Sequence, residues 1–482
     1  MNRSIEENSF DSSAEYAAAS ARRWLGVAIG ALLLAGLFAL LLVLGRMPPF
    51  DRLVSDPLIF KRFLVVHVTL ALVFWFYAYT AGLFALLPST ASRSGLWMLG
   101  GPVATVGVVM VMAAAAIDGA EPILSNYIPV IDHPLFLGGL IAFGVGLALS
   151  FMNRRLLPGA EVEEGIIPAA ARPGLRAAAI CVLLALATFV GSAIATDSFL
   201  APEARYELLF WGGGHVLQFA SEAAMLSVWL ILLASYLGYS PIRRNTAALL
   251  FAFLVLPVLI APLLALQGSA QGFVRGGFTR MMEFGIFPVA TTFLVLCVAA
   301  LRKAARNGRF ADGGWKDVRL LGFGISAGLT VLGFSLGFLI RGPNTMVPAH
   351  YHASIGGVTA AFMAVSYVLL VPLGFHALEK RKRLMRLATW QPVLFGVGQM
   401  VFAVGFGLAG MSGAARKVYG AEQASREGIE ALGLFVMGVG GLVAVAGGLV
   451  FLSICSICLF ERLREKRVTV VLTPTEGAYE HD

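Results

Sequence analysis

Long apolar runs alternate with short polar segments along the whole chain. Each run is long enough to cross about 30 Å of hydrocarbon as an α-helix, which rises about 1.5 Å per residue. There are twelve of these runs, at positions 24–45, 63–87, 97–117, 134–152, 175–195, 206–236, 246–268, 280–301, 318–340, 348–374, 392–412 and 431–460. The pattern predicts an all-α integral membrane protein with twelve transmembrane helices.

The composition supports this interpretation. Of the 482 residues, 58% are hydrophobic and 13% are charged, whereas about 25% of a soluble domain is charged. The net charge of +8 comes from Lys and Arg that lie in loops, so we attribute it to membrane topology and expect no nucleic-acid partner. Four cysteines exclude a disulfide scaffold, and no Cys-x-x-Cys-His motif for covalent haem attachment occurs.

The positive charges also predict the orientation. Most of the 36 Lys and Arg lie in the two tails and in the loops that follow even-numbered spans. Because such residues are enriched in cytoplasmic loops, we expect a multi-pass protein of the inner (cytoplasmic) membrane with both termini cytoplasmic. The chain then divides into a disordered or amphipathic N-terminal tail (1–23), a membrane domain (24–462) and a C-terminal tail (463–482).

Four of the seven histidines lie near the outer ends of inward-running spans. They are His67 in span two, His215 in span six, and His350 and His352 in span ten. Imidazoles are rare in hydrocarbon unless they bind a metal, relay protons or pair. Their similar depth predicts one layer, and their spacing of four spans suggests three four-helix arcs around a common axis. We interpret His133 as part of a helix N-terminus.

The pair in span ten predicts two cofactors. His350 and His352 are two residues apart, a rotation of about 200° on an α-helix, so their side chains leave opposite sides of it. They are poorly placed to share one metal. Two planar macrocycles, one on each side of the helix, fit this geometry, and haem fits it best.

With these residues in place, the chain resembles subunit I of the haem-copper oxidase and nitric oxide reductase superfamily, a fold of twelve helices in three four-helix arcs. The segment Ala349-His350-Tyr351-His352 is similar to the family's Ala-His-Phe-His at the start of helix ten. The resemblance implies that His350 binds a high-spin haem, and that His352 and His67 are the two axial ligands of a low-spin haem.

A second motif supports the resemblance. The segment 406–411, Phe-Gly-Leu-Ala-Gly-Met, and the pair Arg416-Lys417 after it are similar to the family's Gly-Leu-Ala-Gly-Met and its basic pair. The resemblance implies that Arg416 and Lys417 hold haem propionates, which need cationic hydrogen-bond donors. We expect two haems, of the b type.

The second-metal site departs from the family. His215 resembles the histidine of helix six that begins a three-histidine site for copper or non-haem iron, but Thr279 and Arg280 stand where the family has its His-His pair, and Phe219 replaces a tyrosine. One imidazole is a weak site for either metal. We therefore expect the second metal to be missing or bound by an unusual set that includes His215 and Glu283.

Two further residues have predicted roles. A guanidinium from Arg280 beside the high-spin haem would repel a metal cation and favour an anion or a polar diatomic ligand. Glu222 lies two turns deeper than His215 on the same helix face, in an otherwise apolar span, and is a candidate proton relay. The alternative for Glu222 is a carboxylate held neutral or paired with a neighbouring helix.

Three functions remain. The first is a membrane oxidoreductase that passes electrons from a low-spin to a high-spin haem and reduces a small gas, O2 or NO. The second is a non-catalytic electron-transfer or gas-sensing haem subunit. The third is a twelve-span secondary transporter with Glu222 as its coupling carboxylate. For the haem functions we expect a multi-subunit complex whose electron donor is a partner subunit, a soluble cytochrome or quinol.

Overall fold

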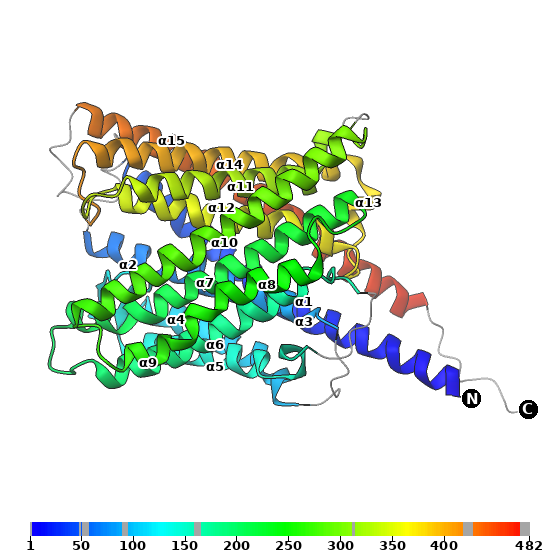
Figure 1. Cartoon of the computed structure of the whole chain (residues 1–482), viewed down its shortest axis with the longest axis horizontal. Helices are drawn as coiled ribbons and strands as arrows, with labels where there is room; N and C mark the ends of the chain where they lie inside the picture. Colours follow the sequence, from blue (N-terminus) through cyan, green and yellow to red (C-terminus); the bar gives the residue numbers. More distant parts are fainter. Residues whose placement is uncertain are drawn as a thin grey trace, which may run out of the picture.

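The computed structural model of the protein is almost entirely helical (Figure 1). It describes residues 2–47, 50, 57–88, 95–158, 165–310, 314–417 and 428–472. The α-helices are α1 (Asn2–Leu44), α2 (Pro57–Val68), α3 (Trp75–Ala85), α4 (Gly100–Ala114), α5 (Pro134–Phe151), α6 (Arg172–Ala195), α7 (Pro202–Leu237), α8 (Arg244–Val255), α9 (Ala261–Ala265), α10 (Gly272–Arg306), α11 (Val318–Phe338), α12 (Met346–Leu370), α13 (Ala377–Lys380), α14 (Lys382–Met411) and α15 (Gly428–Leu472).

Shorter elements join these helices. A π-helical segment, Thr69–Phe74, connects α2 to α3. Two strands, β1 (Glu121–Ile123) and β2 (Val130–Asp132), pair antiparallel with Glu121 opposite Asp132. Turns of 3₁₀-helix cover Leu96–Leu99, Arg154–Leu156, Leu256–Ile260 and Gly314–Lys316.

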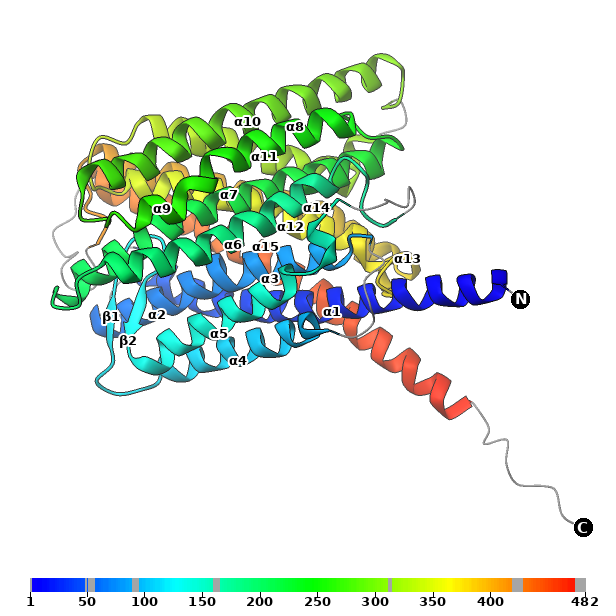
Figure 2. The same ribbon diagram turned by 60° about the horizontal axis from the view of Figure 1, so that its bottom comes forward.

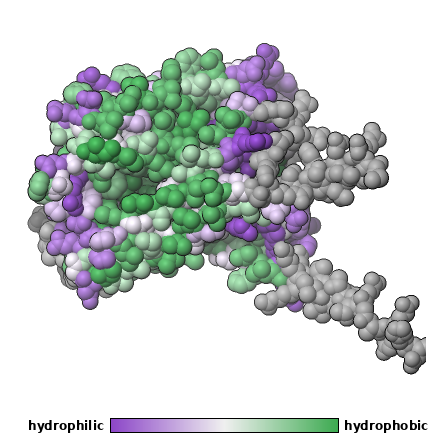
Figure 3. Space-filling model, turned by 90° about the horizontal axis from the view of Figure 1, so that it is seen from below, coloured by the Kyte–Doolittle hydropathy of each residue, from purple (hydrophilic) through white to green (hydrophobic). Residues whose placement is uncertain are grey.

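The prediction of twelve membrane spans is confirmed. Within the described residues, twelve helical segments are long and apolar enough to cross a bilayer. On the face seen in Figure 3, a broad hydrophobic band lies between two more hydrophilic ends. Helices satisfy their own backbone hydrogen bonds, as hydrocarbon requires. The chain is a multi-pass membrane protein.

Helices continue into both predicted tails. Helix α1 is continuous from Asn2, so residues 2–23 extend the helix of the first span, and α15 continues past residue 463 to Leu472. The start of α1 and the end of α15 project from the same end of the bundle (Figures 1 and 2). We call the opposite end, where α2, α7 and α12 begin, the outer end, as the charge pattern predicts.

Glycines set the closest helix contacts. A Cβ atom at Gly405 of α14 would clash with the backbone of Met437 in α15, and one at Gly440 of α15 would clash with the backbone of Phe402 in α14. Small residues of this kind let helix backbones approach closely in membranes. Helix α15 also packs against α1, so the last span closes the bundle onto the first.

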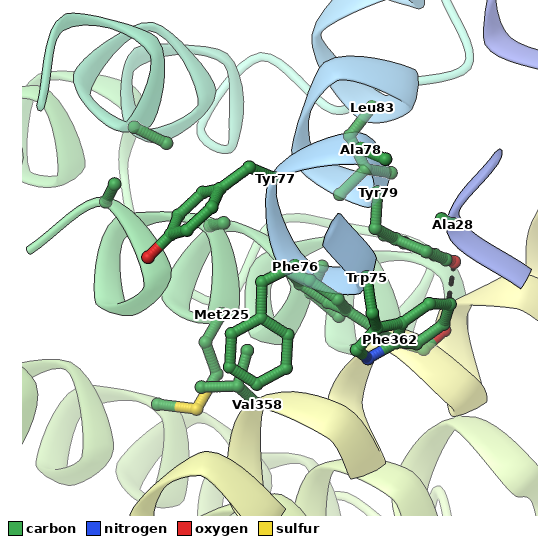
Figure 4. Close-up of a cluster of buried hydrophobic side chains, with 14 of the residues drawn as sticks. Ala28, Trp75, Phe76, Tyr77, Ala78, Tyr79, Leu83, Met225, Val358 and Phe362 are labelled. Carbon is green, nitrogen blue, oxygen red and sulfur yellow. Dashed lines mark hydrogen bonds between the residues drawn. The ribbon is translucent and has the colours of Figure 1, made fainter. Parts of the chain in front are cut away.

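Helix α3 is held between α7 and α12. Tyr77 and Tyr79 leave it in opposite directions (Figure 4). The Tyr77 hydroxyl donates to the carbonyl of Leu217 in α7 at 2.9 Å, and the Tyr79 hydroxyl donates to the carbonyl of Phe362 in α12 at 2.9 Å. These buried hydrogen bonds fix the second span, which carries His67, relative to the tenth.

Candidate functional site

A large, mostly apolar cavity opens between α1, the second span, α12, α14 and α15. Its volume is about 1330 Å³, counted with the space at its open mouth. A few polar side chains line it, among them Arg46, His67, Trp75, His352 and Gln399. An apolar pocket with a small number of placed polar groups is the usual form of a cofactor site.

His67 and His352 both line this cavity. The Nδ1 atom of His67 lies 2.9 Å from the carbonyl oxygen of Ala35 in α1. A carbonyl only accepts, so Nδ1 carries the hydrogen and Nε2 of the neutral ring keeps its lone pair. Metal-binding histidines are commonly oriented by a hydrogen bond of this kind. The structure therefore brings together the two residues that the sequence paired.

His352 is held by packing. Its ring lies 4.7 Å from the Phe402 ring and 6.0 Å from the Phe406 ring, measured between centroids. Its imidazole makes no hydrogen bond to the described residues. On the other side of the cavity, the π-helical segment Thr69–Phe74 starts two residues after His67. Such π-segments occur frequently at functional sites.

Two buried polar atoms at the cavity have no partner among the described residues. They are Nε1 of Trp75 and Oε1 of Gln399; Figure 4 shows the Trp75 ring beside Phe362. An unsatisfied buried group costs about 1–3 kcal/mol, so these atoms indicate that the cavity is shaped for a ligand with its own polar groups. Two imidazoles at an apolar cavity with a cationic rim fit a haem.

The cationic rim includes Arg46, which the sequence analysis did not single out. Its guanidinium lies 5.5 Å from the Phe406 ring centroid and donates to the carbonyl of Arg416 at 3.4 Å. Arg416 in turn bonds the side chain of Asn126. The sequence did contain an indication of this role, because Arg46 directly follows the first span at its predicted outer end. Lys417 is exposed, and its pKa is lowered by desolvation and by Arg416.

His350 faces a different neighbour. Its Nδ1 atom lies 2.7 Å from the carbonyl oxygen of Gly333 in α11, and its ring packs against Gly337. As in His67, this bond places the hydrogen on Nδ1 and leaves the Nε2 lone pair available. The two histidines of α12 thus leave the helix toward different elements, as their spacing predicted.

His215 is buried, and both of its ring nitrogens are bonded. Nδ1 lies 2.7 Å from the carbonyl oxygen of Trp211, and Nε2 lies 2.8 Å from the hydroxyl of Tyr127. Because the carbonyl requires a hydrogen on Nδ1, Nε2 accepts from the phenol. Tyr127 belongs to the loop between β1 and β2. Tyr127 could not be identified from the sequence, because no motif or spacing along the chain links this loop to α7.

The structure does not bring Arg280 and Glu283 to His215. Both are exposed on α10, whereas Phe278 of the same helix is buried with its ring centroid 6.0 Å from the His215 ring. At about 100° per residue, Arg280 lies 200° and Glu283 lies 140° around the helix from Phe278. The proposed distal role of Arg280 and the metal-ligand role of Glu283 therefore have no support from this geometry.

No cluster of three or more His, Cys, Asp or Glu with metal-binding geometry occurs in the described part of the chain. The residues around His215 therefore do not fit a second metal. Glu222 is buried, and its Oε1 has no hydrogen-bond partner among the described residues. Glu222 forms no ion pair with the described residues either. The interpretation as a paired carboxylate is therefore unsupported, and a neutral carboxyl group and a proton relay remain. His133 caps the N-terminus of α5, as the sequence indicated.

Comparison with known proteins agrees with this architecture. No protein-family profile matches the chain. An uncharacterized protein of Rickettsia prowazekii is 25% identical and covers 91% of this chain and 96% of that protein, and one of Aquifex aeolicus is 27% identical over 77% of this chain and 89% of that protein. A haem-copper terminal oxidase solved as a dimer superposes with a TM-score of 0.68 at 16% identity, covering 96% of this chain and 86% of that one. The chain has the fold of that oxidase.

Proposed function

We propose that this protein is a haem-containing membrane redox protein of the cytochrome c oxidase subunit I type. His67 and His352 would hold one low-spin haem, and His350 would hold a second, high-spin haem. The observation that carries the proposal is the cavity with two imidazoles on its walls, one of them oriented by the Ala35 carbonyl with Nε2 available. Haem of the b type supplies one-electron transfer and, with an open coordination position, gas binding.

The chain's own residues orient and isolate the haems. Ala35 and Gly333 fix the ring orientations of His67 and His350. Arg46, with Arg416 and Lys417 near it, places positive charge at the outer end, where propionates would lie. The apolar walls exclude water, which keeps the cofactor environment at low dielectric. Together these features suit electron transfer from the outer side of the membrane to a second haem next to α11.

We propose reduction of a small gas, O2 or NO, as the reaction, with Glu222 holding the proton that such a reduction consumes. The alternative is an electron-transfer or gas-sensing subunit without turnover. One observation favours that alternative: the His215 lone pair, which a second metal would need, is bonded to Tyr127. The proposed donor is a partner subunit, a soluble cytochrome or quinol, within a multi-subunit complex of the inner membrane.

The deciding experiment is a reduced-minus-oxidised spectrum of the purified protein, followed by addition of CO and then by turnover with O2 and NO. We expect two haems per chain, of which one binds CO. Electron-donor consumption in the presence of either gas supports the oxidoreductase, and CO binding without consumption supports the alternative. A colourless preparation from haem-replete cells would contradict both and leave the transporter.

A further inference from the structure

The strongest unexplained feature outside the cavity is Tyr127. It is the one non-glycine residue of the described chain with a positive φ, +67°. That conformation is uncommon for residues other than glycine, and it strains the backbone at a bulky side chain. Strain of this kind persists only where the surroundings fix the backbone, and it is concentrated at functional sites.

The surroundings of Tyr127 do fix it. The preceding Asn126 donates its backbone N–H to Glu207 of α7 at 2.8 Å, and its side chain bonds both Glu207 and Arg416. Within the loop itself, the Ser125 hydroxyl donates to the carbonyl of Ile128 at 2.6 Å. The loop is therefore attached to α7 and to the outer cationic rim at the position where its backbone is strained.

Helix α7 is shaped to receive the Tyr127 ring. Gly214 leaves room for it, because a Cβ atom at that position would clash with Cβ and Cγ of Tyr127. The ring lies edge-on to Trp211 at 5.9 Å and tilted against His215 at 4.5 Å, between centroids. The Tyr127 side chain thus packs against α7 beside His215, and its hydroxyl lies 2.8 Å from Nε2 of His215.

We propose that Tyr127 takes the place of a second metal in this protein. A metal at His215 would need the Nε2 lone pair, since Nδ1 is already bonded to the Trp211 carbonyl. The Tyr127 hydroxyl donates to that lone pair, and the described part of the chain holds no group of three or more His, Cys, Asp or Glu that would complete a metal site. His215 and Tyr127 together form a fixed phenol–imidazole pair at the site where an oxidase of this fold would be metallated. Tyr127 is a positioning residue, because it acts through His215.

The inference rests on the proposed function, since it assumes a haem on His350 that the pair faces. The position supports this: α7 packs against α10, α11 and α12, His215 touches Phe278 of α10, and His350 is bonded to Gly333 of α11. The two histidines therefore lie on α7 and α12, which pack against each other.

The first test measures metals in the holoprotein. Purified wild type is incubated with Cu(I) or Fe(II) under reducing conditions and desalted, and its metals are quantified against haem. We expect haem iron alone. Retention of one copper or one non-haem iron per chain, abolished by His215→Ala, would overturn the proposal. This arm needs no variant of Tyr127.

The second test uses the C–O stretching band of CO bound to the high-spin haem. Tyr127→Phe removes the hydroxyl and frees the Nε2 lone pair, so we expect the band to shift relative to wild type. Tyr206→Phe is the matched control, because its hydroxyl bonds Asp132 of the same hairpin and its removal should leave the band unchanged. An identical band in wild type and Tyr127→Phe would overturn the proposal. Absence of haem from wild type would contradict the proposed function itself, which is a separate outcome.

Discussion

Two histidine environments in one helical bundle behave in opposite ways. At the cavity, His67 and His352 stand on the walls of an open space, and the Nε2 lone pair of His67 has no partner among the described residues. On α7, His215 lies in close packing with both nitrogens bonded. The same residue type is therefore available for a ligand in one region and satisfied by the protein in the other. Position along the chain does not distinguish them; the neighbouring elements do.

The largest effect should come from removing an imidazole at the cavity. His352→Ala leaves a low-spin haem with one axial ligand, so we expect complete loss of the low-spin signal in the reduced spectrum. His376→Ala, an exposed histidine bonded to Glu379, is the control and should retain it. A low-spin signal that survives in both His352→Ala and His67→Ala would show that the cavity does not hold the low-spin haem.

The second-largest effect should come from replacing Glu222, the buried carboxyl group on the same helix as His215. Glu222→Gln keeps the shape but cannot transfer a proton, and loss of a positioned proton donor typically costs about 10²-fold or more in rate. We expect that fall in gas reduction with unchanged haem content. Glu283→Gln makes the same chemical change on the exposed face of α10 and should leave turnover unaltered. Equal rates in the two variants would assign Glu222 a structural role.

Two glycines of α15 allow a direct comparison between a closely packed position and a position at the open cavity. Gly440→Ala forces a Cβ atom against the Phe402 backbone, whereas a Cβ at Gly448, which lines the cavity, has nothing within 4 Å. Overpacking of this kind costs about 1–3 kcal/mol. Thermal unfolding in detergent should show the loss in Gly440→Ala only. Similar destabilisation in both variants would mean that the cavity is closed in the folded apoprotein.

The unpaired Trp75 indole gives a smaller effect. Trp75→Phe removes a buried N–H that has no partner among the described residues, so we expect the apoprotein to gain about 1 kcal/mol in unfolding free energy. In the control, Trp229→Phe removes an N–H that donates to Ser326 at 2.8 Å and should lose a similar amount. If Trp75→Phe destabilises the apoprotein as much as the control does, its N–H has a partner before any cofactor binds.

The smallest expected effect is that of pH on the Tyr127 pair. Burial of the hydroxyl, and then Glu207, raise the pKa of Tyr127 above its ordinary value of about 10. Because the pKa of Tyr127 is raised in the folded protein, the phenol stays protonated at every pH below about 10. Above that pH the unfolded chain loses the Tyr127 proton while the folded protein still retains it. The C–O band should therefore keep its position from about pH 6 to pH 9. A shift within that window that disappears in Tyr127→Phe would show that the phenol ionises there.

Much of the architecture followed from the sequence alone. The apolar runs predicted all twelve spans, because hydrocarbon admits only long self-satisfied helices and so leaves few alternatives. The two-residue spacing of His350 and His352 predicted their divergence, since helix geometry fixes it. Helix periodicity also described Glu222 correctly as a residue two turns below His215 in an apolar span. Local rules and the bilayer determined these features.

Only the tertiary structure decided which of those residues meet. The resemblance placed Arg280 at a ligand position of the second-metal site, and Glu283 was an expected ligand with His215, yet the rotation of α10 turns both outward and presents Phe278 instead. The loop that carries Tyr127 lies 88 residues before His215, and Arg46 reaches the cavity rim from the first span. No period or spacing encodes such contacts, because they depend on how helices far apart in the chain pack and rotate. The sequence by itself determined the spans, and packing determined which histidines remain free to bind a cofactor.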